Sequence, residues 1–259
     1  MYKVWILILS LLSFDAFSAP KSEPWPFWDK HTQSTQRIDH SQWQILLDAY
    51  LVERGENTLF RYASVTDKDK QALKAYVSSL AGIDPRQYSQ AEQYAYWVNL
   101  YNALTVDLIL DNYPVKSITK LGGLFSFGPW GEEIIEVAGK PLSLNDIEHR
   151  ILRPIWQDPR THYAVNCASL GCPNLQVQAF TADNTEQLLE QSAQAFINSG
   201  KGAKLSNAKL QLSSIYDWFA VDFDGEQGVL RHLAKYRSDL TGFEGKVSFD
   251  YDWKLNKAD

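Results

Sequence analysis

The stretch from Gln90 to Asn112 constrains the fold most, because it is apolar around most of the circumference of the helix it would form. Ser89 and Glu92 have the spacing of a capping box, which predicts a helix start, and Pro114 predicts its end. A helix that is apolar on nearly all sides must be covered by other elements. We therefore expect a long helix buried at the centre of the protein.

Shorter helices and strands surround this segment without a regular βαβ order. Helix signals occur in five further segments: 41–54, 67–81, 143–152, 184–198 and 225–237. Strand signals occur in four: 133–137, with a hairpin turn at 138–140, then 161–168, 205–212 and 247–253. This order predicts an α+β fold in a single domain, with a buried central helix and a small mixed or antiparallel sheet.

The amino terminus has the parts of a secretory signal peptide, residues 1–18. Lys3 precedes an apolar run from Val4 to Leu12, and Ala16 and Ser18 are the small residues before the expected cleavage point. That run is shorter than the roughly 20 residues of a membrane helix, and no later segment approaches this length. We expect a periplasmic or secreted protein without stable membrane insertion.

Residues 19–40 are expected to form an extended leader, because their prolines disfavour a helix. Three aromatic side chains of this leader, Trp25, Phe27 and Trp28, are expected to dock on the body of the protein. Residues 41–256 then form the single globular domain. With a net charge of −6 and no basic stripe, the chain is not expected to bind nucleic acid.

Side chains capable of chemistry concentrate between Glu148 and Cys172. This segment holds both cysteines of the chain and two of its five histidines. The set comprises Glu148, His149, His162, Asn166, Cys167, Ser169 and Cys172. An isolated histidine is usually a hydrogen-bonded structural residue. The clustering of these two histidines with both cysteines favours a functional role instead.

In one interpretation, a thiolate at Cys167 attacks a carbonyl group while His149 or His162 acts as its base. If residues 161–168 form a regular strand, His162 and Cys167 point to opposite faces. That geometry favours His149 as the partner unless the strand bends.

In a second interpretation, Cys167 and Cys172 form a disulfide, which an exported protein can maintain. Closing so short a loop gives little entropic stabilisation, so the bond would fix the turn or be redox-active. The spacing differs from the two-residue spacing of thioredoxin-type sites. A third interpretation joins both cysteines with His149 and His162 in a zinc site, but the spacing supports it poorly. We expect no metal and no other cofactor.

Asn99 and Asn102 lie three residues apart on one face of the central helix, where buried amides must be hydrogen-bonded. They either tie the helix to neighbouring loop backbone or orient a catalytic histidine or an oxyanion. Asp217 and Asp222 are expected to cap a helix or pair with arginine, without a catalytic role.

Four segments together resemble the family called domain of unknown function 547. They are WVNLYNALT (97–105), LNDIEHRILR (144–153), HYAVNCASLGCPNL (162–175) and YDWKLN (251–256). The resemblance extends from about Trp43 to Asn256. It implies that the cysteines are more than an extracellular staple, since the family includes intracellular proteins, and this favours a thiol site.

The leading hypothesis is a thiol hydrolase or acyltransferase that acts on an amide or ester of a small molecule or peptide. Cys167 is its nucleophile, His149 or His162 its base, and Asn99 or Glu148 the orienting group. One alternative is a redox protein that cycles Cys167 and Cys172 between dithiol and disulfide. Another is a non-enzymatic module that grips a peptide or glycan with its aromatic residues and the glycine-rich loop 121–131.

Overall fold

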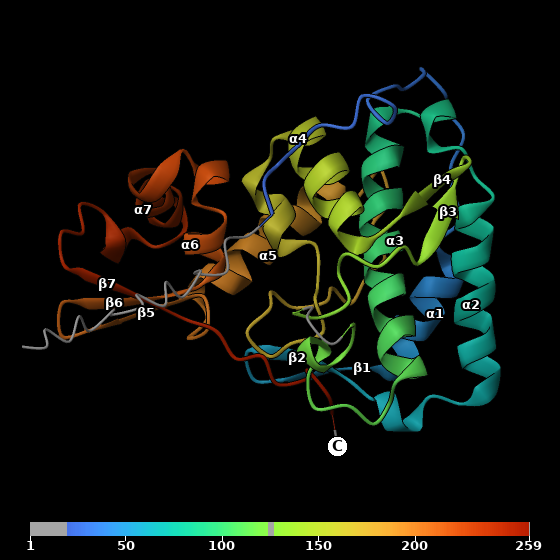
Figure 1. The fold of residues 1–259 in the computed structure, drawn as a ribbon. Coiled ribbons are helices and arrows are strands. Elements are labelled where there is room, and N and C mark those ends of the chain that lie inside the picture. The colour runs from blue at the N-terminus through green and yellow to red at the C-terminus, as the bar shows by residue number, and fades with distance from the viewer. Residues whose placement is uncertain (1–19, 124–126, 259) are drawn as a thin grey trace, which may run out of the picture.

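The computed structural model describes residues 20–123 and 127–258 (Figure 1). The predicted signal peptide lies outside the described residues, as do residues 124–126 of the glycine-rich loop. Within the described ranges, no helix combines the length and the apolar character that crossing a membrane requires.

Helix α3 (Gln90–Asp111) is the buried central helix that the sequence predicts. The Ser89 hydroxyl accepts a hydrogen bond from the Glu92 backbone N–H at 3.3 Å, so the predicted cap forms. The Glu92 carboxylate does not complete a capping box. It accepts from the backbone N–H of Ile38 at 2.7 Å, and thereby ties the preceding segment to the helix.

Helices α1 (Ser41–Tyr50) and α2 (Asp67–Ala81) lie beside α3, as Figure 1 shows. The predicted helix over 41–54 is too long. Leu51–Arg54 forms strand β1, which pairs antiparallel with β2 (Asn57–Phe60) around Gly55, a glycine with a φ of +60°. Pairing with a partner strand overrides the helical pattern here, because a ladder of hydrogen bonds outweighs weak local propensity.

The segment after α3 follows most of its predicted course. Strands β3 (Ile135–Val137) and β4 (Lys140–Leu142) form the expected hairpin. The helix start at Ser143 forms too, but residues 146–152 wind as a π-helix that continues into α4 (Arg153–Trp156). Pro154 does not end this helix. It lies in the first turn of α4, where its missing N–H costs little.

The predicted strand over 161–168 is wrong. Residues 159–163 form a short 3₁₀ helix and the following residues are irregular. The side-chain amide of Asn102 binds the carbonyl of Ala164 and the N–H of Asn166, at 2.9 and 2.8 Å. Hydrogen bonds from side-chain amides therefore take the place of bonds to a partner strand. The apolar residues of 161–168 reflect burial and not strand structure. Because no strand forms here, the expectation that His162 and Cys167 point to opposite faces does not hold.

The carboxyl-terminal part consists of small helices and a three-stranded sheet. The helices are α5 (Thr185–Asn198), α6 (Ile215–Trp218) and α7 (Gly225–Tyr236). The strands are β5 (Ala203–Ser206), β6 (Lys209–Ser213) and β7 (Lys246–Asp250). The expected strand 205–212 is thus split by a turn. Because β6 pairs antiparallel with β5 and parallel with β7, this sheet is mixed, and the predicted α+β class is confirmed.

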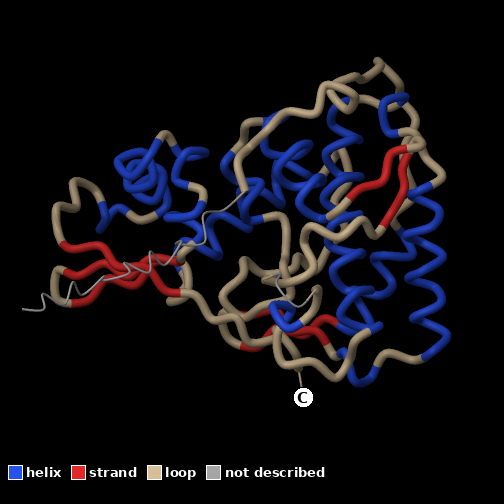
Figure 2. The backbone as a smooth tube through the Cα atoms, in the orientation of Figure 1, coloured by secondary structure: helices blue, strands red, loops and turns tan. Residues whose placement is uncertain are grey.

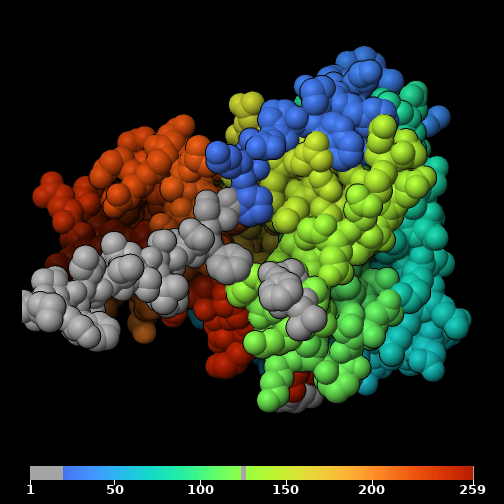
Figure 3. Space-filling view, viewed as in Figure 1, coloured from blue at the N-terminus to red at the C-terminus, as the bar shows by residue number. Residues whose placement is uncertain are grey.

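The three small sheets lie apart from one another around the helices, as Figure 2 shows. Buried apolar side chains form two clusters, one around α3 and one between α5, α7 and the three-stranded sheet. The leader docks as expected. Trp28 is 1% exposed and its ring lies 5.0 Å from that of Trp97. The leader crosses the surface beside residues 149 and 150, whose carbonyls accept its backbone N–H groups (Figure 3).

Replacing Asn99 by alanine should lower the free energy of unfolding by about 2–4 kcal/mol. The Asn99 amide donates to the Phe180 carbonyl at 2.7 Å and accepts from the Phe180 N–H at 3.0 Å, so the change leaves two buried backbone groups unpaired. Urea denaturation measures the loss. Asn112→Ala, at the exposed end of the same helix, is the control and should cost under about 1 kcal/mol. Equal effects of the two changes would contradict this role for Asn99.

Candidate functional site

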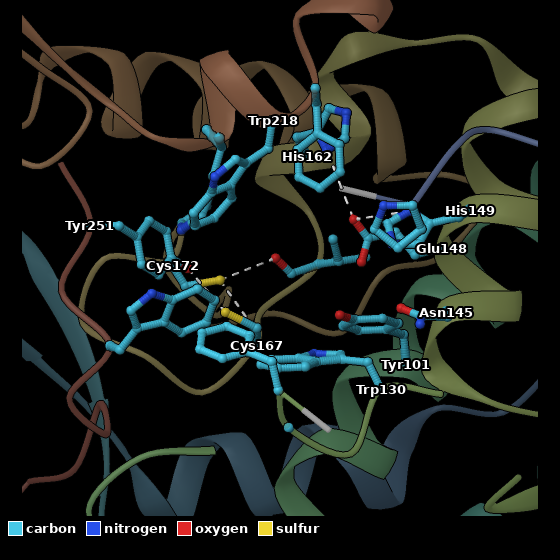
Figure 4. Close-up of a pocket in the computed structure, with 18 of the residues that line it drawn as sticks. Tyr101, Trp130, Asn145, Glu148, His149, His162, Cys167, Cys172, Trp218 and Tyr251 are labelled. Atoms are coloured by element: carbon cyan, nitrogen blue, oxygen red, sulfur yellow. Dashed lines mark hydrogen bonds and ion pairs between the residues drawn. The ribbon is translucent and has the colours of Figure 1, made fainter. Parts of the chain in front are cut away.

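Residues of both apolar clusters line a cavity of about 560 Å³. Figure 4 shows the side chains of this cavity. Its size is typical of sites that enclose a small molecule. Seven aromatic side chains line the cavity: Tyr101, Phe127, Trp130, Trp218, Phe219, Tyr251 and Trp253. Most of the polar groups among these rings come from the predicted segment between Glu148 and Cys172, and Asn145 lies just before it.

Both cysteines line this cavity as free thiols. The backbone N–H of Cys167 donates to the sulfur of Cys172 at 3.0 Å. The Cys167 sulfur also lies 3.0 Å from the phenol oxygen of Tyr251 and 3.1 Å from the hydroxyl of Ser169. Cys167 is partly exposed, whereas Cys172 is buried.

The two thiols differ in acidity. Hydrogen bonding from Cys172, and then from Ser169 and Tyr251, lowers the pKa of Cys167 against the opposing effect of burial. Burial raises the pKa of Cys172 well above its ordinary value, and its hydrogen bond to Cys167 adds to this. Cys167 is therefore the thiol that ionises first, and a thiolate is the reactive form.

The carboxyl-terminal segment reaches Cys167 because Gly171 has no side chain. The Gly171 N–H donates to the carbonyl of Asp252 at 2.8 Å, and a Cβ at this glycine would stand 2.7 Å from the Asp252 nitrogen. This close approach places the neighbouring Tyr251 against the thiol.

Lys201 holds the turn between the cysteines from outside the cavity. Its ammonium group donates to the carbonyls of Leu170 and Cys172 at 3.2 and 2.8 Å, and to the Asn174 side chain at 2.7 Å. Burial lowers the pKa of Lys201 to about 8. The residue thus fixes the turn and brings a positive charge near the thiols.

The other polar wall contains a fixed histidine. His162 Nε2 lies 2.7 Å from Asp222, and Arg153 Nε donates to the same carboxylate oxygen at 2.6 Å. Burial opposes ionisation of Asp222, but the bonds from His162 and Arg153 hold its pKa below the ordinary value. Since this carboxylate can only accept, Nε2 of His162 carries a proton, and a neutral ring has its free lone pair on Nδ1.

His149 has the opposite tautomer. Arg153 Nη1 lies 2.9 Å from His149 Nδ1, and an arginine can only donate, so Nδ1 is the acceptor and the proton is on Nε2. Burial lowers the pKa of His149 to about 4, which keeps the ring neutral near pH 7. His149 is therefore a hydrogen-bond donor to the cavity, and His162 is the better-placed base of the two. The sequence favoured His149 as the base, and the structure favours His162.

Glu148 lies between the two histidines and is 8% exposed. One of its oxygens is 3.8 Å from Nδ1 of His149 and 3.9 Å from Nδ1 of His162, beyond hydrogen-bond distance. The phenol of Tyr101 stands beside it, and burial together with the Glu148 charge raises the pKa of Tyr101 well above its ordinary value.

The structure thus brings five of the predicted site residues to one cavity: Glu148, His149, His162, Cys167 and Cys172. The thiols and the histidines occupy different walls (Figure 4), and no hydrogen bond between described atoms joins a thiol to either ring. Asn99 is not among the lining residues, because its amide is used by Phe180. Over the described ranges, no group of three or more His, Cys, Asp or Glu side chains could hold a metal ion, so the zinc arrangement does not form.

Sequence reasoning missed Asp222, Tyr251 and Lys201. The expected pairing of Asp222 with an arginine is confirmed, but its bond to His162 was not foreseen. Tyr251 lies 84 residues from Cys167 along the chain, and its only signal was membership of the closing YDWKLN segment.

The family described as "Protein of unknown function, DUF547" matches residues 85–197. The resemblance inferred from the sequence is confirmed over this range, which holds the central helix, both cysteines, Glu148 and both cavity histidines. Asp222 and Tyr251 lie beyond it. Searches of curated proteins and of solved structures found no match.

Replacing Tyr251 by phenylalanine should raise the pKa of Cys167, because one hydroxyl that stabilises the thiolate is lost. Alkylation of Cys167 by iodoacetamide at pH 7 should slow by about threefold to tenfold. The rate should recover at higher pH, where the thiol ionises without this bond. Tyr236→Phe, which removes a hydroxyl bonded to exposed Glu190, should leave the rate unchanged. Identical pH profiles for both variants would show that Tyr251 has no influence on the thiol.

Proposed function

We propose that the cavity is a thiol–disulfide exchange site in which Cys167 attacks and Cys172 resolves. One observation carries the proposal: the Cys172 sulfur lies 3.0 Å from the backbone nitrogen of Cys167, so the second thiol is next to the first. The division of labour is supported by exposure and acidity. The partly exposed Cys167 has the lowered pKa, and the buried Cys172 has the raised one.

The reaction proceeds in two exchanges. The Cys167 thiolate attacks one sulfur of a substrate disulfide, the substrate S–S bond breaks, and the first substrate thiolate leaves and takes up a proton. Cys172 then loses its proton and attacks the Cys167 sulfur, which releases the second thiolate and closes the Cys167–Cys172 bond. Two electrons and two protons pass from the protein dithiol to the substrate, which is thereby reduced.

The second wall supplies groups suited to these proton transfers. His149 carries its proton on Nε2, has no described partner there and lines the cavity, so it can donate a hydrogen bond to a leaving thiolate. His162, held by Asp222, keeps Nδ1 free to accept a proton within the same cavity. Export remains a prediction.

Reduced protein treated with Ellman's disulfide should release two equivalents of thionitrobenzoate and become two hydrogens lighter. Cys172→Ser should release one equivalent and retain a mixed disulfide on Cys167, since the resolving thiol is absent. Cys167→Ser should react slowly, because the remaining thiol is buried and weakly acidic. Intact mass after alkylation measures all three, and the chain has no other cysteine. Two stable adducts on the unaltered protein would rule out a resolving pair.

Acyl transfer is the second candidate, and the His162–Asp222 pair favours it. A histidine oriented by a carboxylate is a standard general base, and this one lines the same cavity as Cys167. In this scheme Cys167 attacks an ester or amide carbonyl and expels the leaving group. His162 then takes a proton from the water or other acceptor that attacks the thioester.

If acyl transfer occurs, His162→Gln should slow deacylation by about 100-fold and accumulate an acyl adduct on Cys167. Mass spectrometry after mixing with p-nitrophenyl acetate detects the adduct. His31→Gln, at an exposed histidine, is the matched control and should turn over normally. Failure to trap any acyl group on Cys167 would exclude this function while leaving disulfide exchange untouched.

A further inference from the structure

Across the cavity from the thiols, Glu148 is a buried carboxylate without a cationic partner. It is 8% exposed, and among the described residues no lysine or arginine forms an ion pair with it. Among groups that can carry a positive charge, only the rings of His149 and His162 come within 4 Å of its oxygens in the described residues, and the Tyr101 phenol hydrogen-bonds to it.

Neither ring donates to Glu148 when neutral. Nδ1 of His149 uses its lone pair to accept from Arg153, and Nδ1 of His162 is the unprotonated nitrogen, because Nε2–H is bonded to Asp222. Arg153 does not compensate the charge. Its Nε is bound to Asp222 and its Nη1 to the Pro20 carbonyl and His149. This part of the cavity therefore holds several acceptors and no lysine or arginine paired with Glu148 among the described residues.

A buried carboxylate is costly unless it is paired with a cation as well as hydrogen-bonded, and Tyr101 supplies only a hydrogen bond. The aromatic lining of the cavity also suits a cationic nitrogen, since Tyr101 lies beside Glu148 and Trp130 lines the same cavity. The volume, about 560 Å³, fits a small molecule. We propose that the cavity takes a small organic substrate whose ammonium nitrogen binds at Glu148 while its disulfide faces Cys167. This names the substrate class of the thiol site and so rests on the proposed function.

Binding without chemistry tests the recognition. Reduced protein is titrated with phenethylammonium and with its neutral counterpart, phenethyl alcohol, and followed by tryptophan fluorescence, because Trp130, Trp218 and Trp253 line the cavity. The ammonium compound should bind at least about tenfold more tightly. Glu148→Gln should abolish this preference. Glu136→Gln, which removes the same charge at an exposed site, should retain it.

The preference is overturned if the alcohol binds as tightly as the amine, if the amine does not bind, or if Glu148→Gln keeps the full difference. The comparison of the two compounds on unaltered protein decides the point even if a variant fails to fold.

Exchange rates test the link to the thiols. Cystamine, a disulfide with two ammonium groups, should react with Cys167 about tenfold faster than bis(2-hydroxyethyl) disulfide, and Glu148→Gln should remove the difference. Exchange at equal rates would overturn the substrate class and leave the thiol function intact. Amine binding without exchange of any disulfide would overturn the thiol function and leave recognition by Glu148 standing.

Discussion

A chain of buried amides holds the site together. Asn102, on the central helix, binds the backbone on either side of Val165, and Asn166 in turn binds the N–H of Ala168 and the carbonyl of Pro173. Asn256 donates to Asn166 at 3.3 Å and thereby links the end of the chain to the same network. The irregular segment that carries both cysteines lies outside the named helices and strands. Backbone hydrogen bonds to residues 252–256 fix one side of it, and these amides fix the other, because a buried amide left unpaired costs more free energy than the bond itself contributes.

The central helix and the chemistry-bearing segment were predictable, because both are encoded locally. Apolar residues around most of the circumference of 90–112 favour a buried helix, and the hydrogen bonds of its amides follow from the rule that buried polar groups are bonded. The wrong predictions have a common cause. At 51–54 the structure is set by pairing with a partner strand, and at 161–168 it is set by hydrogen bonds from side-chain amides. A local periodic pattern of apolar residues contains neither of these interactions. The bond between His162 and Asp222 joins residues 60 positions apart and has no local signal.

Arg153 sets the electrostatics of the histidine wall. By donating to Nδ1 of His149 it places the proton of that ring on Nε2, and it also donates to Asp222, the carboxylate that accepts from Nε2 of His162. Because Arg153 is bonded to Asp222 and His149, it forms no ion pair with Glu148. One buried guanidinium, itself paired with Asp222 and stacked over Phe219 at 4.7 Å, therefore defines a polar wall with distinct positions for a base, a donor and a negative charge.

The close approach at Gly171 also has a consequence for the timing of reactivity. The hydroxyl of Tyr251 reaches Cys167 only when the last residues of the chain have docked against that glycine. A nascent or partly folded chain lacks this contact, and its thiols have the reactivity of ordinary cysteines. The acidic thiol is thus a property of the completed fold and depends on residues that lie 84 positions apart along the chain.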